Sequence, residues 1–251
     1  KNLPKASYAN SKLRLFKFMD PILNIEITVS MNKAQSPNKL CIIYSHSNTE
    51  NLESISENLN ELSKKLNCTI FSYDYLGFGE TGGVPTEQSI IAVANSVFVL
   101  IRQSFPESQI LLWGRAIGSV PTIKIASENE VEGCVLESPL ASALRAVNLN
   151  SAMFGNMDSY DNTPSIQFVK CPILIFHGTS DKIINISNGE TLYQIREGIQ
   201  SLQGVKNDMV ENYPVVIGKK TWFCKLESAG HNNILSQFMH SVVGVTQQFK
   251  M

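Results

Sequence analysis

The fold of this chain is decided by the stretch Leu111-Leu-Trp-Gly114-Arg115-Ala116-Ile117-Gly118. The largely apolar run Gln109–Trp113 is typical of a strand covered on both faces. A helical pattern starts at about Ile117 and has Pro121 in its first turn, where the missing N–H costs little. Two glycines flank Ala116, and glycine fits where a Cβ would collide as the chain reverses. The sequence therefore predicts a sharp strand-to-helix turn with Ala116 at its centre.

Short β-branched runs alternate with helical patterns on both sides of this turn, which is typical of a parallel sheet built from βαβ units. Strands are expected at Leu13–Phe18, Ile25–Val29, Leu40–Tyr44, Cys68–Tyr73, Gln109–Trp113, Val131–Leu136, Pro172–Phe176 and Trp222–Leu226. Helices are expected at Leu52–Leu66, from about Thr86 to before Pro106, from about Ile117, at Gly189–Arg196 and at Ile234–Val243. The first two strands carry alternating polar residues and are expected to be antiparallel. We predict an α/β fold, with a mostly parallel sheet of about eight strands, helices on both faces and one domain over residues 1–251.

The composition excludes several classes of protein. Lys and Arg (21) balance Asp and Glu (22) without a basic stripe, so nucleic acid is not an expected partner. No apolar run approaches the ~20 residues that a transmembrane segment needs. No C-x-x-C pair is present, so we expect no metal site. The five cysteines stand in or beside apolar runs and are expected to be buried free thiols in a reducing, cytoplasmic compartment: Cys41, Cys68, Cys134, Cys171 and Cys224.

The turn around Ala116 fits the pattern G-x-S-x-G except at its centre. Serine hydrolases present their nucleophile on this kind of turn, with the serine between the two glycines. Taken alone, Gly114–Gly118 is better interpreted as an ordinary strand-to-helix turn with two glycines. A methyl group cannot attack a carbonyl, so a covalent mechanism cannot run through residue 116. In a related triad system, loss of the nucleophile lowers kcat about a millionfold.

Two further loops carry an acid and a histidine in a meaningful order. The strand Pro172–Phe176 runs into a loop that ends at Asp181, and the last strand is followed by Gly230-His231-Asn232. In α/β-hydrolases the nucleophile, the acid and the histidine follow one another along the chain in this order. There the histidine takes the hydroxyl proton and the acid fixes its tautomer. Asp181 alone could cap a helix and His231 alone could be a surface residue, but together with Ala116 they predict a triad arrangement.

The loop Tyr44–Thr49 lies between the first core strand and its helix. In this architecture that loop supplies one backbone N–H to the oxyanion hole, and the residue after the nucleophile supplies the other. Asn48 and Ile117 are therefore the candidates, with Ser47 as the alternative one residue earlier.

Together these motifs resemble the Bem46-like branch of α/β-hydrolase-domain proteins. The resemblance is carried by the segments Ser45–Asn48, Phe71–Gly79, Gly114–Gly118, Glu137–Pro139, His177–Asp181 and Gly230–Asn232. It implies an α/β-hydrolase fold and a serine hydrolase of the kind that removes palmitate from cysteine thioesters. The family's roles fall on Ala116 (nucleophile), Asp181 (acid) and His231 (base). The chain departs from the family where Ala116 replaces the serine and where His46-Ser47-Asn48 replaces His-Gly-Asn.

Two interpretations of Ala116 stay open. An engineered change from serine would leave an otherwise intact hydrolase of carboxylic esters or acyl thioesters. A natural pseudoenzyme would keep the pocket as a binding module. In both, the expected ligand is a small acyl ester or an acylated protein or peptide, bound by a monomer.

Several other polar residues and one glycine-rich loop have alternative interpretations. The loop Gly77–Gly82 fits the dinucleotide fingerprint, but no helix opens directly after it and the next strand ends without an acid, so we expect no cofactor. Ser119 is expected inside the helix after the turn, and Ser138, before a proline, as a helix cap. Asp74 and Glu137 are expected to have structural roles.

Two segments and the start of the chain carry further expectations. Residues 140–170 are expected to form a short cap over an open, shallow pocket, with the apolar stretch Met153–Met157 in it. An insertion is expected at about 202–220, before the last strand. The chain starts at Lys1 rather than Met, so a preceding segment is expected, and peripheral membrane attachment through it stays open.

Overall fold

The computed structural model describes residues 7–9, 12–147 and 158–249, whose strands form one ten-stranded sheet in the order β1-β2-β4-β3-β5-β6-β7-β10-β9-β8. The strands are β1 (Leu15–Asp20), β2 (Ile25–Lys33), β3 (Leu40–Ser45), β4 (Thr69–Tyr73), β5 (Gln109–Arg115), β6 (Gly133–Glu137), β7 (Ile173–Gly178), β8 (Asn207–Val210), β9 (Tyr213–Ile217) and β10 (Thr221–Leu226). The helices are α1 (Leu52–Leu66), α2 (Glu87–Ser104), the 3-10 turn η1 (Ala116–Gly118), α3 (Ser119–Glu128), α4 (Ala143–Ala146), α6 (Thr163–Ile166), α7 (Ser187–Glu197) and α8 (Ile234–Gln248).

Six parallel strands form the middle of the sheet, in the order β4-β3-β5-β6-β7-β10. Every residue of β3, β4, β6 and β7 is buried. Strands covered by helices on both faces have no solvent side, which explains why their sequences are nearly continuous apolar runs. The predicted fold class is therefore confirmed, including the antiparallel pairing of β1 with β2.

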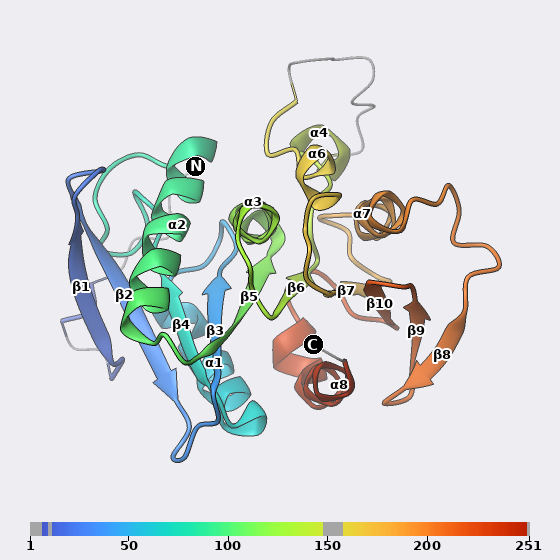
Figure 1. Cartoon of the computed structure of the whole chain (residues 1–251), viewed down its shortest axis with the longest axis horizontal. Coiled ribbons are helices and arrows are strands. Elements are labelled where there is room, and N and C mark those ends of the chain that lie inside the picture. Colours follow the sequence, from blue (N-terminus) through green and yellow to red (C-terminus); the bar gives the residue numbers. More distant parts are fainter. Residues whose placement is uncertain (1–6, 10–11, 148–157, 250–251) are drawn as a thin grey trace.

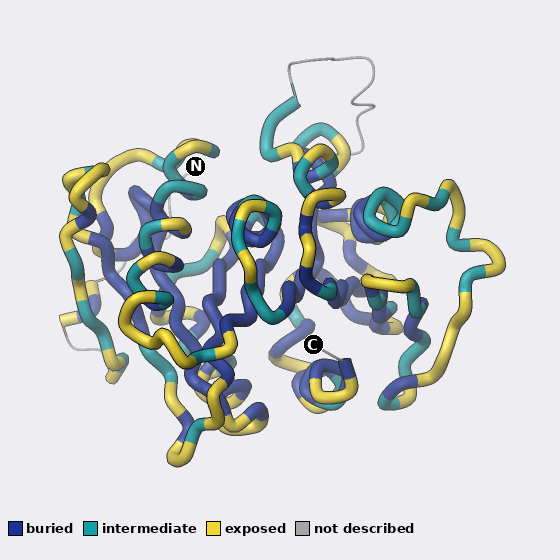
Figure 2. Tube along the Cα trace, in the orientation of Figure 1, coloured by how far each residue is buried: buried dark blue, intermediate teal, exposed yellow. Residues whose placement is uncertain are grey.

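The helices lie in two layers on opposite faces of the sheet (Figure 1). Helices α1 and α8 pack against one face, and α2, α3, α6 and α7 pack against the other. Helix α1 begins at Leu52 because the Asn51 side chain accepts hydrogen bonds from the first free N–H groups of the helix. Its apolar positions fall on one stripe, and all of them are buried: Leu52, Ile55, Leu59, Leu62 and Leu66. Figure 2 shows the outcome, with the central strands buried between helices whose outer sides are exposed.

The number of strands is ten, and the predicted number of about eight is wrong. The two additional strands, β8 and β9, form an antiparallel hairpin inside the predicted insertion and extend the sheet beyond β10. Glu211 and Asn212 make the turn with φ values of 52° and 66°. A two-residue turn with positive φ is usually announced by Asn-Gly or Asp-Gly, and Glu-Asn lacks the glycine. The hairpin therefore has no strong signal in the sequence.

The predicted cap lies only partly within the described residues. Its two ends contain α4 and α6, whereas the stretch Met153–Met157 lies outside the described residues. All five cysteines are buried and free, as expected. Within the described ranges, no helix has the length and apolar character that a membrane crossing requires.

Candidate active site

The turn around Ala116 has the backbone that the glycine pattern predicts. Strand β5 ends at Arg115, and Ala116 follows with a φ of 49°, in the left-handed region that non-glycine residues rarely adopt. A Cβ on Gly118 would collide with the backbone carbonyl oxygen of Ser45, and one on Gly114 would collide with the carbonyl of Gly118. Both glycines are thus required by close backbone approach. The chain holds residue 116 in a strained conformation, which costs about 1–3 kcal/mol and is typical of functional sites.

The carboxylate of Asp181 accepts a hydrogen bond from the imidazole of His231, with 2.8 Å between Oδ2 and Nδ1. Asp181 follows β7 and His231 follows β10, and these strands are parallel neighbours. The other oxygen, Oδ1, accepts the backbone N–H groups of Ile183 and Ile184 at 2.9 Å, so the carboxylate is held in one orientation. Because an ionised carboxylate only accepts, Nδ1 of His231 donates, which leaves the lone pair of the neutral ring on Nε2. This is the tautomer that a general base needs.

The pKa of Asp181 lies well below its ordinary value. Burial opposes ionisation, but contacts from the rings of His177 and His231, together with the N–H of Ile184, outweigh it. Nε2 of His177 lies 2.8 Å from the carbonyl oxygen of Ile184 and 3.5 Å from Oδ2 of Asp181. His177 therefore braces the loop that carries the acid. The Asp181 carboxylate therefore remains charged at neutral pH.

The three oxyanion candidates lie in different environments. Ser47 is buried, and its N–H donates to Oε2 of Glu50 at 2.8 Å. Asn48 is exposed, and no described residue accepts a hydrogen bond from its backbone N–H. Ile117 lies in the first turn of η1, where N–H groups have no acceptor inside the helix. Asn48 and Ile117 therefore have the free donors, and the N–H of Ser47 is already engaged.

The sequence reasoning missed Arg115, whose buried side chain joins the turn to the histidine loop. Its Nη2 donates to the carbonyl oxygen of His231 at 2.9 Å and to Oδ1 of Asn232 at 3.0 Å. Its Nη1 pairs with Glu50, and its Nε lies 3.3 Å from Oε1 of Glu137. Arg115 and Glu137 face each other on neighbouring strands β5 and β6. The sequence does carry one signal for this contact, because two apolar strands end in residues of opposite charge, Arg115 and Glu137.

The serines near the turn are not placed as substitute nucleophiles. The Oγ of Ser119 is buried at the start of α3, donates to the carbonyl of Ala116 at 2.7 Å and accepts from Asn162 at 3.1 Å. Ser138 does not cap a helix, so that prediction is wrong: it is a buried residue with a φ of 44°. The cap of α4 is Ser142 instead. The chain bends at Ser138 straight after β6, and the helix starts only further on.

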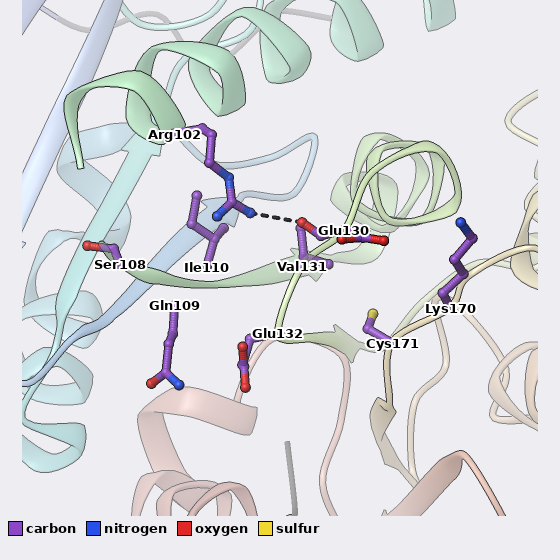
Figure 3. Close-up of a pocket in the computed structure, with 9 residues that line it drawn as sticks. All are labelled: Arg102, Ser108, Gln109, Ile110, Glu130, Val131, Glu132, Lys170 and Cys171. Carbon is purple, nitrogen blue, oxygen red and sulfur yellow. Dashed lines mark hydrogen bonds between the residues drawn. The ribbon is translucent and has the colours of Figure 1, made fainter. Parts of the chain in front are cut away.

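A hollow of about 470 Å³ lies at the other edge of the parallel strands (Figure 3). Its lining comes from the amino ends of β5, β6 and β7, where Arg102 donates to the carbonyl of Glu130 at 2.8 Å. Open α/β sheets bind ligands at the carboxyl ends of their strands, so the hollow does not belong to the candidate site. In the described part of the chain, no group of three or more His, Cys, Asp or Glu residues is arranged to hold a metal ion.

The strand order, the strained turn and the acid–histidine pair together define the α/β-hydrolase fold. The esterase Pf2001 of Pyrococcus furiosus superposes with a TM-score of 0.73 at 14% identity, covering 99% of this chain and 95% of that one. An α/β serine hydrolase homologue from Coxiella burnetii superposes with a TM-score of 0.67 at 14% identity, covering 97% and 100%. Identities this low establish the fold alone.

Proteins related in sequence have higher identity to this chain than these solved structures do. The α/β hydrolase domain-containing protein aho-3 of Caenorhabditis elegans is 35% identical over 155 residues, 61% of this chain and 47% of that protein. The human α/β hydrolase domain-containing protein 17B is 34% identical over 163 residues, 63% of this chain and 56% of that protein. The matches thus span about half the length of these curated relatives. No family model matches the chain.

Proposed function

We propose that this chain has the site of a serine hydrolase of carboxylic esters or acyl thioesters, with the nucleophile position occupied by Ala116. Asp181 is the acid and His231 the base. The observation that carries the proposal is the 2.8 Å hydrogen bond between Asp181 and His231, on a loop that Arg115 ties to the strained turn. An acid and a histidine in this order, beside such a turn, serve acyl transfer in the hydrolases that share this fold.

The chemistry follows from these positions once a hydroxyl stands at residue 116. Nε2 of His231 takes the hydroxyl proton as the oxygen attacks the acyl carbon, and later donates that proton to the leaving group. Asp181 stabilises the imidazolium in between. The backbone N–H groups of Asn48 and Ile117 donate hydrogen bonds that stabilise the negative charge on the acyl oxygen. With Ala116 in place no acyl-enzyme forms at this position, and turnover is expected to be lower by about a millionfold.

The substrate class we propose is an acylated protein or peptide, with palmitoyl thioesters of cysteine as the first to be tested. The sequence resembles hydrolases that remove palmitate from cysteine, and its curated relatives are named as hydrolase-domain proteins. A thioester carbonyl is attacked by the same machinery as an ester carbonyl, so both chemistries fit one site.

The test is to restore the hydroxyl with Ala116→Ser and to measure hydrolysis of a short-chain ester and of a palmitoyl-cysteine peptide. We expect turnover that is absent from the parent chain. The matched control is Ala116→Ser combined with His231→Gln, which keeps the hydroxyl and removes the base. A folded Ala116→Ser variant that hydrolyses neither substrate contradicts the proposal.

A second candidate function is an acyl-binding protein that does not hydrolyse its ligand. The observation in its favour is Ser47, whose N–H is engaged by Glu50 in the loop that should supply an oxyanion donor. On this account Ala116→Ser stays inactive, while the parent chain binds an acylated peptide. Hydrolysis by Ala116→Ser alone separates the two candidates. Adding Ser47→Gly, which gives this loop the glycine of the similar family, tests whether the serine side chain is what prevents turnover.

A further inference from the structure

A buried ionic cluster lies directly beneath the candidate site. It consists of Arg115 between the carboxylates of Glu50 and Glu137, and Arg115 is only 7% exposed. We propose that Arg115 is a positioning residue, which fixes the histidine loop and the oxyanion loop to the turn at Ala116. This inference rests on the function proposed above. It assigns a role to a residue that touches neither substrate nor the reacting atoms.

Arg115 contacts the histidine loop directly. Nη2 of Arg115 donates to the backbone carbonyl of His231 itself, at 2.9 Å, and to the side chain of Asn232, at 3.0 Å. Arg115 immediately precedes Ala116 in the chain. One guanidinium therefore links the backbone of the base to the backbone of the nucleophile position. Displacing a reacting group by about 1 Å lowers turnover by about a hundredfold, so this link matters for rate.

The same side chain reaches the oxyanion loop through Glu50. Nη1 of Arg115 pairs with one oxygen of Glu50, and the other oxygen accepts the N–H of Ser47 at 2.8 Å. The neighbouring residue, Asn48, supplies the donor that we propose for the oxyanion. The path of the loop before Asn48 thus depends on a carboxylate that Arg115 holds in place.

The third partner holds the guanidinium itself. Glu137 lies 3.3 Å from Nε of Arg115, and its second oxygen accepts from Trp113 at 3.2 Å and from Tyr44 at 3.4 Å. Burial raises the pKa of the Glu137 carboxyl, and the Arg115 guanidinium opposes that rise. Nη1 and Nη2 of Arg115 donate to Glu50 and to the histidine loop, and Nε faces Glu137 as an ion pair without a hydrogen bond. A planar guanidinium reaches these three directions at once, and a lysine ammonium does not. Both the planar shape and the positive charge of the Arg115 guanidinium therefore contribute to holding these partners in place.

The test compares Arg115→Lys and Arg115→Met in the Ala116→Ser background, with Lys225→Met as the matched control. Lys225 also pairs with a glutamate, Glu190 of α7, at 2.8 Å, and none of its described contacts is with Arg115 or the histidine loop. We expect both Arg115 variants to lower kcat by about a hundredfold with KM changed by less than about twofold. Lys225→Met should leave both constants unchanged. Folded Arg115 variants with kcat within about twofold of Ala116→Ser would overturn the inference.

A second readout uses the chain with Ala116 and needs no turnover. The Nδ1–H proton of His231, hydrogen bonded to Asp181, is expected to give a resolved downfield signal in a proton NMR spectrum. Arg115→Lys should shift or broaden this signal, and Lys225→Met should not. If Arg115 variants fail to fold, Asn232→Ala removes one of the two loop contacts and should give a smaller change of the same kind. An unchanged signal overturns the inference, whereas a changed signal beside an inactive Ala116→Ser contradicts only the proposed function.

Discussion

The two edges of the parallel strands carry charged side chains in different surroundings. At the carboxyl edge Arg115, Glu137, Asp181 and His231 are buried and joined by hydrogen bonds or ion pairs. At the amino edge Glu130 and Lys170 are exposed, and the hollow between them is open to solvent. Burying charge is costly unless it is paired and hydrogen bonded, so the buried polar cluster, and not the open hollow, is the candidate functional site.

The largest expected effect is on kcat, when the candidate acid Asp181 is replaced. In the Ala116→Ser background, Asp181→Asn should lower kcat by about ten-thousandfold, because the amide no longer holds His231 in the required tautomer. Steady-state hydrolysis of the short-chain ester measures this. The control is Asp208→Asn, which changes an exposed carboxylate on β8 and should have no effect. Equal activity of the two variants would mean that Asp181 is not the acid.

The comparison of the two edges is tested directly by removing one arginine from each. Arg115→Met leaves Glu50 and Glu137 without their cation and should destabilise the fold by about 3–5 kcal/mol. Arg102→Met at the hollow should change stability by about 0.5 kcal/mol, because its donor is half exposed to water. Urea unfolding of the two variants measures both values. Similar losses at the two edges would show that the buried cluster contributes no more than a surface contact.

The acid also predicts how stability depends on pH. The folded pKa of Asp181 is lowered, so its contribution is present above the unfolded pKa, about 4, and is lost as pH falls toward the lower folded value. Stability of the parent chain should therefore fall more steeply than that of Asp181→Asn as pH decreases below about 4. Urea unfolding at a series of acidic pH values measures the two slopes. Parallel slopes would contradict the lowered pKa.

The smallest expected effect concerns the strain at the turn. Ala116→Gly should stabilise the chain by about 1 kcal/mol, because glycine adopts a φ of 49° without a Cβ penalty. The control is Ala92→Gly within α2, where the same exchange should destabilise by about 0.5–1 kcal/mol. Thermal or urea unfolding gives the signs. A loss of stability at both positions would show that residue 116 is not strained.

The sequence predicted the central part of the fold because those signals are local. Most of the inner strands are largely apolar runs, and the helical patterns from Leu52 and from about Thr86 predicted the starts of α1 and α2 within about one residue. The hairpin Asn207–Ile217 was missed because its turn uses Glu211 and Asn212 without a glycine. Only pairing with the edge of β10 makes these residues strands, and that is a contact distant in the chain.

Some residues of the candidate site could likewise be predicted from local sequence signals, and others could not. Ala116, Asp181 and His231 could be found because each follows the end of a recognisable strand, in an order with chemical meaning. Arg115 was not assigned, because two of its partners come from loops that are distant in the chain and the third lies opposite it only in the register of β5 with β6. The sequence left Asn48 and Ser47 open as candidate oxyanion donors, because the hydrogen bond from the Ser47 N–H to Glu50 is a loop contact that has no sequence signal.

The most direct measurement is to react Ala116→Ser with a fluorophosphonate and to map the adduct by mass spectrometry. The probe forms a covalent bond only with an activated hydroxyl beside a base and oxyanion donors. We predict one adduct per chain, located on the residue introduced at 116 and abolished by adding His231→Gln. A folded variant with no adduct, or with its adduct on Ser119 or another serine, would contradict the assignment of this edge as a hydrolase site.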